Sequence, residues 1–248
     1  NGVSGILLED VQKALVAERY IYAQIKAFNK GTSLAQVLES TFPSKPNDIA
    51  PKLASQVSEI NYVSQVGLVE VSSLADITLA SIESQELTAK FNTGTKLNTA
   101  ISCVKSVVGN SGGFSEVLSL VRSCLALQQR YIPNVASWKS PKDKALSQWQ
   151  NSNFYVAQHS KTWFREEHQR DSNKQSAGKL PRQAGYSCLT KDSAGFFLLE
   201  EPIEPFVGEL ENQKQSVEIF RDNGFLHHSD FHLFILSGSN QAAIENSV

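Results

Sequence analysis

The chain has 248 residues, a formal net charge of −2 at neutral pH and 41% hydrophobic residues. This length allows one large hydrophobic core or two smaller ones. The near-zero charge gives no reason to expect nucleic acid or an acidic membrane surface as a partner. No apolar run is as long as a membrane span and no signal peptide is visible, so we expect no membrane-spanning segment.

The pattern of residues predicts strands and helices in alternation along the chain. Residues 21–28, for example, place Ile21, Ala23, Ile25 and Ala27 on one face of a strand. Strands are expected at 3–9, 21–28, 67–72, 100–108, 154–157, 183–189, 195–201 and 232–236, and helices at 33–41, 74–90 and 114–128. Such alternation is typical of a layered α/β fold.

The helix expected at 114–128 has a broad apolar face, formed by Val117, Leu120, Val121, Cys124, Leu125 and Leu127. A face of this width predicts a helix buried inside a layered fold. Residues 165–181 contain almost no apolar side chains and are expected to form a surface loop. Residues 202–230 are acidic and contain proline. We therefore predict a domain over 1–202 and a linker from 203 onward.

The three cysteines, Cys103, Cys124 and Cys188, are far apart and lack Cys-x-x-Cys spacing. They are expected to be reduced core residues of a cytoplasmic protein, without a disulfide or a zinc site. The chain also contains no Met and begins at Asn1 inside a strand-like run, which indicates a fragment of a longer protein.

A glycine-rich turn, Gly109 to Gly113, precedes the helix expected at 114–128. Such a turn can hold an anion at the start of a helix, or it can let two backbones pack closely. The turn lacks the Lys-Ser/Thr of a phosphate loop and the glycine spacing of a dinucleotide site. A close crossing of helix and strand is therefore favoured, and Asn110 and Ser111 are candidates to cap the helix.

Three further groups of residues have a functional and a structural interpretation. A metal could bind to His227, His228, Asp230 and His232, but their polar linker supplies no second shell of hydrogen bonds. Lys139, Lys142 and Lys144 could contact an acidic carrier protein, although a solvated loop is favoured. We expect His159 and His168 to lie on the surface, and Trp138, Trp149 and Trp163 to be packing anchors.

Four segments resemble, in the same order, the C-terminal half of a ketosynthase, the condensing enzyme of fatty-acid and polyketide synthases. Residues 5–25 resemble the family's G-A-L-V-L … R-I-Y-A-V-I passage, and residues 66–73 resemble V-x-Y-V-E-A-H-G. Residues 103–133 resemble S-V-K-S-N-I-G-H and the helix after it, and residues 153–201 resemble the family's ending. The resemblance implies the C-terminal half of a thiolase-like layered α/β fold, with a trailing linker.

The resemblance also implies where the chemistry of a working ketosynthase would lie. The family has histidines at the positions of Ser72 and Asn110, where they bind the thioester carbonyl and stabilise charge as the malonyl unit loses CO₂. Ser72 is shorter than histidine and cannot take up a proton near neutral pH as an imidazole can. Asn110 can donate a hydrogen bond but cannot titrate. Lys105 matches the family's lysine. Because losing one such donor costs about 10²–10³ in rate, we expect no catalytic residue here, and no set of substitutes formed by Ser72, Lys105 and Asn110.

Two further differences from the ketosynthase pattern also argue against catalysis. The family's glycine-rich gating loop is replaced by Leu189-Thr-Lys-Asp-Ser-Ala-Gly195, and none of the three cysteines has the strand-to-helix setting of a nucleophile. Within the family, the chain resembles the ketosynthase-like region of the acyltransferase subunit of bacterial omega-3 polyunsaturated fatty acid synthases. Residues 232–240 are similar to the start of the segment that joins ketosynthase to acyltransferase.

The resemblance therefore predicts a non-catalytic scaffold domain in a multidomain synthase subunit. Expected partners are an acyl carrier protein with its phosphopantetheine, other synthase subunits, a covalently linked acyltransferase domain and a second copy in a homodimer. No metal or cofactor is expected within the segment itself. Two alternatives remain: a module that binds acyl groups or a carrier protein, and a condensing or decarboxylating enzyme with substituted active-site residues.

Overall fold

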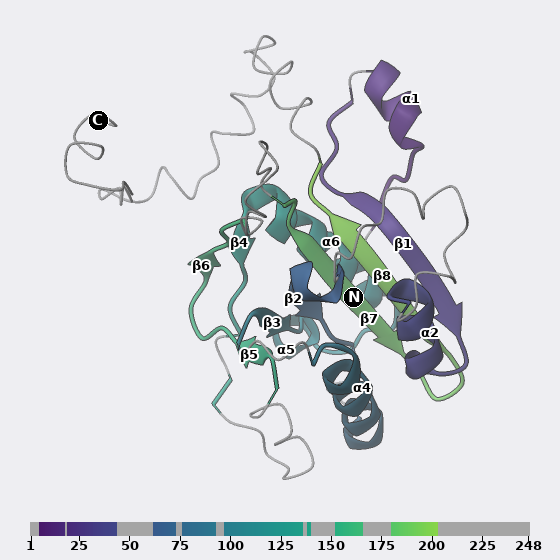
Figure 1. Ribbon diagram of the computed structural model, residues 1–248, viewed down its shortest axis with the longest axis vertical. Coiled ribbons are helices and arrows are strands. Elements are labelled where there is room, and N and C mark those ends of the chain that lie inside the picture. The colour runs from purple at the N-terminus through teal and green to yellow at the C-terminus, as the bar shows by residue number, and fades with distance from the viewer. Residues whose placement is uncertain are drawn as a thin grey trace, which may run out of the picture. The chain divides into compact units, whose positions relative to one another are not determined.

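A six-stranded mixed sheet lies at the centre of the computed structural model (Figure 1). Its strand order is β1-β8-β7-β2-β3-β5, and only β8 runs against the other five. The strands are β1 (Gln24–Gly31), β2 (Val66–Glu70), β3 (Thr99–Ser102), β5 (Phe154–Val156), β7 (Gln183–Leu189) and β8 (Ala194–Glu200). A separate antiparallel pair joins β4 (Tyr131–Ile132) to β6 (Lys161–Thr162).

The structure describes residues 5–17, 19–43, 62–72, 76–92, 97–135, 138–139, 152–165 and 180–202. Several expectations lie outside these residues: the linker from 203 onward, the strand at 232–236, the His227–His232 cluster, most of the loop at 165–181, and His168, Trp149, Lys142 and Lys144. They stay predictions.

Helices cover both faces of the sheet. They are α1 (Val11–Val16), α2 (Leu34–Thr41), α4 (Ile77–Lys90), α5 (Lys105–Val108) and α6 (Gly113–Gln129), with a short 3₁₀ helix, η2 (Tyr62–Gln65). Side-chain oxygens of Asp10, Ser33 and Asp76 accept backbone N–H groups at the starts of α1, α2 and α4, as helix-capping residues do. None of the described helices has the length and apolarity needed to cross a bilayer.

Two hydrophobic clusters show that the fold has three layers. Val69 packs in one cluster with α2 and α4, whereas its neighbour Leu68 packs in the other with the end of α6. Since successive residues of a strand point to opposite faces, the two clusters lie on the two sides of the sheet. This helix–sheet–helix layering confirms the mixed α/β, thiolase-like class expected from the sequence.

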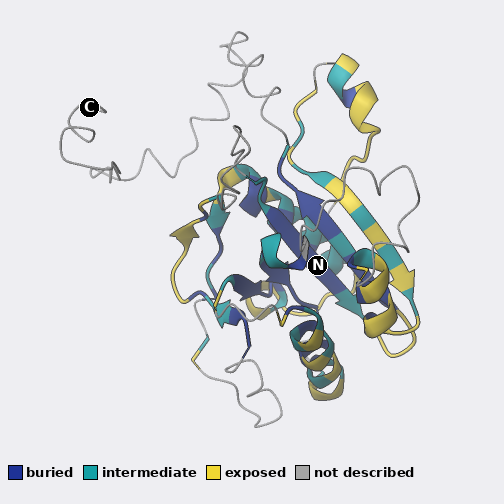
Figure 2. Ribbon diagram, viewed as in Figure 1, coloured by how far each residue is buried: buried dark blue, intermediate teal, exposed yellow. Residues whose placement is uncertain are grey.

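Burial decreases from the inner strands towards the edge at β1 (Figure 2). β7 and β8 are buried over most of their length, and Phe196 and Leu199 are fully buried. The edge strand β1 alternates between half-buried and exposed residues, and Phe28 is half exposed.

The first predicted strand, at 3–9, is wrong for the residues that the structure describes. Residues 5–10 have no regular structure, and Leu7 and Leu8 are 84% and 67% exposed. A strand requires a neighbour for its backbone N–H and C=O groups, and none of the described strands pairs with this segment. The predicted strand at 100–108 is also too long, because the chain turns into α5 at Lys105.

The buried face of α6 differs from the one expected. Ser115, Ser119 and Ser123, spaced four residues apart, are all completely buried, while the predicted apolar residue Leu125 is 38% exposed. Leu127 alone of the six predicted apolar residues is fully buried. Small side chains let a helix lie close to a sheet, so hydrophobicity alone did not indicate which side of α6 faces inward.

Candidate functional site

Ser72 lies just beyond the carboxyl end of β2, where open α/β sheets place their sites, and it is buried. Its backbone N–H donates to Oε1 of Glu83 at 3.2 Å. Its Oγ accepts the backbone N–H of Leu189 at 3.0 Å, and its carbonyl oxygen accepts Nζ of Lys105 at 2.7 Å. Three contacts from three different segments therefore hold this residue in place.

Lys105 connects the segment around Ser72 to α6. It begins α5, its side chain is only 7% exposed, and its Nζ forms an ion pair with Oε1 of Glu116. The underlying strands are paired in parallel, with Glu70 opposite Ser102, and Val71 N–H donates to the Ser102 carbonyl at 2.9 Å. Two segments separated by about thirty residues in the sequence thus lie side by side.

Asn110 takes no part in this network among the contacts that the structure describes. It is exposed, in the turn between α5 and α6, and its Oδ1 accepts Oγ–H of Ser115 at 3.4 Å. No described contact joins Asn110 to Ser72 or Lys105. The structure therefore brings two of the three family positions together and leaves the third at the surface.

The glycine-rich turn does not form the close crossing that we expected. A Cβ added at Gly109, Gly112 or Gly113 would meet no heavy atom within 4 Å. Gly109 and Gly112 have φ angles of 78° and 61°, a conformation that favours glycine. Gly112 itself is the N-cap of α6, with no side-chain capping bond, so capping by Asn110 or Ser111 is also wrong.

Sequence reasoning missed two residues that complete the network, Glu116 and Tyr186. The hydroxyl of Tyr186 donates to Oε2 of Glu116, so that carboxylate binds Tyr186 with one oxygen and Lys105 with the other. Tyr186 is 2% exposed and stacks on Phe197. The sequence did offer one indication of Glu116, which is the only acidic residue in the seventeen-residue helix α6.

Burial raises the pKa of the Tyr186 phenol far above its usual range, and the nearby Cys188 and Glu116 add to this effect. The phenol is therefore a permanent donor at physiological pH. Burial also raises the pKa of Cys188, with a further contribution from the charge of Glu116. A thiol in this environment is a weak nucleophile, because thiolate is the reactive form.

The other two cysteines are no more reactive. Burial raises the pKa of Cys103 to about 11, assisted by the charge of Glu70, and burial raises the pKa of Cys124 to about 11. No group of three His, Cys, Asp or Glu side chains among the described residues is arranged to hold a metal ion.

Of the remaining candidates, His159 and Lys139 are exposed, in agreement with a surface position. Trp163 is buried and packs so closely on Gly67 that a Cβ there would lie 2.6 Å from its indole nitrogen. This confirms Trp163 as a packing anchor, while Trp138 is half-buried. Ser72, Lys105 and Asn110 line neither the cavity beside Trp163 nor the one beside Leu120, both formed by described residues.

Part of the chain matches a known protein family in sequence, and most of it matches solved structures in fold. Residues 35–139 match the model of the β-ketoacyl synthase C-terminal domain family. No curated protein sequence matches the chain.

Solved ketosynthases share the fold. One is the ketosynthase from module 6 of the bacillaene synthase of Bacillus subtilis 168, with a TM-score of 0.56 and 18% identity over 79% of this chain and 33% of that one. An oxazolomycin ketosynthase domain of Streptomyces albus JA3453 has a TM-score of 0.56 and 17% identity over 79% of this chain and 34% of that one. A third, from module 1 of the bacillaene synthase of Bacillus amyloliquefaciens FZB42, has a TM-score of 0.54 and 16% identity over 78% of this chain and 32% of that one.

The chain spans about a third of the length of these ketosynthase structures. The family match covers the segment from α2 to Lys139, which contains Ser72, Lys105 and Asn110. The fold match covers 78–79% of this chain. Together, the sequence match over residues 35–139 and the shared fold support a ketosynthase-like C-terminal domain.

Proposed function

We propose that this chain is a non-catalytic ketosynthase-like scaffold domain in a subunit of a multidomain fatty-acid or polyketide-type synthase that also carries an acyltransferase. One observation carries the proposal: the polar groups at the matching family positions bind one another. Lys105 is bound to Glu116 and the Ser72 carbonyl, Ser72 Oγ is bound to Leu189, and the second oxygen of Glu116 is bound to Tyr186.

This network lacks what decarboxylation requires. Charge that develops on a thioester oxygen needs donors that are already aimed at it and not committed elsewhere. The Ser72 hydroxyl oxygen accepts the backbone N–H of Leu189, and the ammonium of Lys105, on a side chain that is only 7% exposed, is paired with the carboxylate of Glu116. Asn110 is exposed, and no described contact joins it to either residue. A layered core can persist for its architecture alone, because apolar burial stabilises it whether or not the site reacts.

The assembly context is part of the same proposal. The solved relatives are ketosynthases of polyketide synthases, and the resemblance to the acyltransferase subunit of omega-3 polyunsaturated fatty acid synthases supports a neighbouring acyltransferase domain. On this basis we infer that an acyl carrier protein and other synthase subunits are partners, and that the domain pairs with a second copy. Any transferase activity would then belong to the neighbouring domain.

A decarboxylation assay tests the proposal. The protein is incubated with malonyl-acyl carrier protein labelled at the free carboxyl group, and released CO₂ is counted beside an active ketosynthase. We expect no release above that of a protein-free control. Release that is lost in Lys105→Met and kept in the surface variant Lys191→Met would overturn the proposal in favour of an enzyme with substituted residues.

Calorimetry tests the binding alternative. Acyl-pantetheine compounds and holo-acyl carrier protein are titrated into the protein up to millimolar concentration. A scaffold gives no saturable heat with acyl-pantetheine. Saturable binding that is altered by Tyr186→Phe, which removes one contact of Glu116, would instead establish an acyl-binding module at this site.

A further inference from the structure

A buried polar cluster lies between the sheet and α6. Glu70, the last residue of β2, is completely buried on the same face of the strand as Leu68, which packs with the end of α6. Ser102 of β3 is opposite Glu70 in the strand pairing, and Ser119 lies on the inward side of α6; both are completely buried. Arg122 follows Ser119 by three residues, which places it on the same side of the helix. Three elements thus bring polar side chains into one part of the core.

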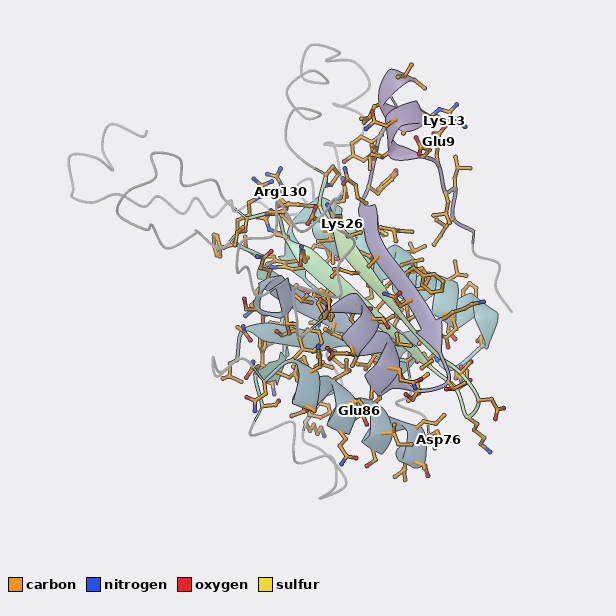
Figure 3. All side chains as sticks on the ribbon, turned by 45° about the vertical axis from the view of Figure 1, so that its right-hand side comes forward. Glu9, Lys13, Lys26, Asp76, Glu86 and Arg130 are labelled. Carbon is orange, nitrogen blue, oxygen red and sulfur yellow. The ribbon has the colours of Figure 1, made fainter. Side chains whose placement is uncertain are left out.

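The charged groups of this cluster are cut off from solvent. Lys13, Lys26 and Arg130, in contrast, lie on the outside of the fold, where they are exposed (Figure 3). Glu70 is fully enclosed, and Nη1 of Arg122 is buried as well. Burying a charged group is costly unless hydrogen-bond partners replace the water that it loses. Each buried polar atom of the cluster therefore needs a partner.

Protein atoms supply only some of these partners. Glu70 Oε1 accepts the backbone N–H of Val104, just before α5, and Arg122 Nη2 donates to a backbone carbonyl oxygen at 2.9 Å. The remaining polar atoms of the cluster have no hydrogen-bond partner among the described residues: Glu70 Oε2, Arg122 Nη1 and the hydroxyl oxygens of Ser102 and Ser119. The carboxylate and the guanidinium therefore do not form a direct ion pair.

These unpartnered atoms nevertheless lie near one another. Burial raises the pKa of Glu70, whereas the charge of Arg122, the Val104 amide and the hydroxyls of Ser102 and Ser119 lower it. Hydroxyl groups affect a carboxyl in this way only from a short distance, yet both lie outside hydrogen-bond distance of it. Buried polar groups that face one another across more than a hydrogen-bond length are commonly bridged by water.

The chemistry of the four atoms indicates which ligand fits between them. A carboxylate oxygen accepts a hydrogen bond, a guanidinium nitrogen donates one, and a serine hydroxyl can do either. A water molecule donates two hydrogen bonds and accepts two, so it matches all four atoms. A metal cation would be repelled by Arg122, and an anion would be repelled by Glu70. Internal water molecules typically make about three hydrogen bonds to groups of this kind.

We propose that an ordered internal water molecule binds between Glu70 Oε2 and Arg122 Nη1, with the hydroxyls of Ser102 and Ser119 as its other partners. The water completes a polar link from α6 to the end of β2, inside a core that is otherwise packed by apolar side chains.

The link reaches the family site through the backbone. The N-cap residue of α5, Val104, provides no side-chain capping bond, and its N–H donates to Glu70 instead. Lys105 is the first residue of α5. The water-mediated link between Arg122 and Glu70 therefore holds the start of the helix from which Lys105 projects.

A crystal structure of the whole chain, at a resolution that shows ordered water, is the first test. We expect electron density for a water molecule within hydrogen-bond distance of both Glu70 Oε2 and Arg122 Nη1. Direct contact between the carboxylate and the guanidinium would overturn the proposal, and so would a gap between them without density.

Oxygen-17 magnetic relaxation dispersion provides a test in solution, because it reports water molecules that stay inside a protein longer than the protein takes to tumble. Ser119→Val puts a methyl group where the hydroxyl meets the water, so the signal should fall by about one water molecule. The matched control is Ser123→Ala, on the same side of α6, because the Ser123 hydroxyl already donates to the Ser119 carbonyl at 3.0 Å. This control should keep the signal of the parent.

A signal that Ser119→Val leaves unchanged would overturn the proposal, and an equal fall in Ser123→Ala would overturn it as well. Circular dichroism verifies that both variants fold. If Ser119→Val does not fold, Ser102→Val tests the same water molecule from β3, where a β-branched residue suits the strand.

Discussion

Replacing Glu116 by Gln tests whether the network at the family site stabilises the fold. The amide keeps the shape of the side chain and can still accept the Tyr186 hydroxyl, but it removes the negative charge. Lys105 would then hold an ammonium group in a position where its side chain is only 7% exposed. Its contact with the Ser72 carbonyl at 2.7 Å would remain.

The expected cost follows from this burial. Removing one partner of a buried ion pair costs about 3–5 kcal/mol, because the remaining charge is left without compensation. The Glu116 side chain is 29% exposed, so solvent already screens part of the pair. We therefore expect the free energy of unfolding to fall by about 2–3 kcal/mol, at or just below the lower limit of that range. For a chain of this size, this corresponds to a loss of about 5–10 °C in Tm.

Urea unfolding of a double-mutant cycle provides the measurement. The cycle combines Glu116→Gln with Lys105→Met, and we expect a coupling free energy on the order of 2 kcal/mol. The matched control is the pair of Lys90 with Glu39, joined at 2.6 Å but with the Glu39 side chain 54% exposed. Glu39→Gln should cost less than about 1 kcal/mol.

A coupling free energy below about 0.5 kcal/mol would refute the reasoning. It would mean that Lys105 and Glu116 are solvated independently and that the network does not close the site. An equal cost for Glu39→Gln and Glu116→Gln would refute it as well, since burial would then make no difference.

Three other predictions concern the core. Burial raises the pKa of the Glu70 carboxyl above its ordinary value near 4.5. The protonated carboxyl therefore contributes fully to stability below about pH 4.5, and this contribution is lost as the pH rises through the folded-state pKa. Glu70→Gln should therefore gain stability relative to the parent from pH 4 to pH 8, and a difference that does not vary with pH would contradict this. Gly185→Ala places a Cβ against the ring of Phe196 and should lower the free energy of unfolding by about 1–3 kcal/mol. Adding Phe196→Leu to this variant should recover part of the loss. An unchanged urea midpoint in Gly185→Ala alone would contradict the prediction, because it would show that the ring moves freely. Because Cys103 is 1% exposed with a pKa of about 11, a thiol reagent at pH 8 should modify its peptide only after unfolding, and prompt labelling of the native protein, seen by mass spectrometry, would count against that burial.

Local patterns predicted most of the regular structure. The helix at 33–41 and the strands at 183–189 and 195–201 agree with α2, β7 and β8 to within one residue at each end. The periods of 3.6 and 2 residues are set within a segment, so they are visible without knowledge of its neighbours. The run at 3–9 shows the limit, because an apolar run becomes a strand only where another strand accepts its hydrogen bonds.

The candidate site was predictable only in part. Order and spacing indicated Ser72, Lys105 and Asn110 through the family resemblance, and the structure brings Ser72 and Lys105 into contact. Tyr186 could not be assigned, because it is 70 residues from Glu116 in the chain and meets it only across the packed sheet and helix. Similarly, no pattern in α6 indicated that its serines, rather than Leu125, would face the sheet.

The amino-acid sequence by itself determined the alternation of strands and helices, the kinship with ketosynthases and the absence of histidine at Ser72 and Asn110. Each of these depends on residue type and order alone. Only the tertiary structure decided that Asn110 is exposed and has no described contact with Ser72, and that Glu116 and Tyr186 complete the network. The reason is physical: ion pairs and hydrogen bonds act over a few ångströms, and folding alone brings residues so distant in the chain within that range.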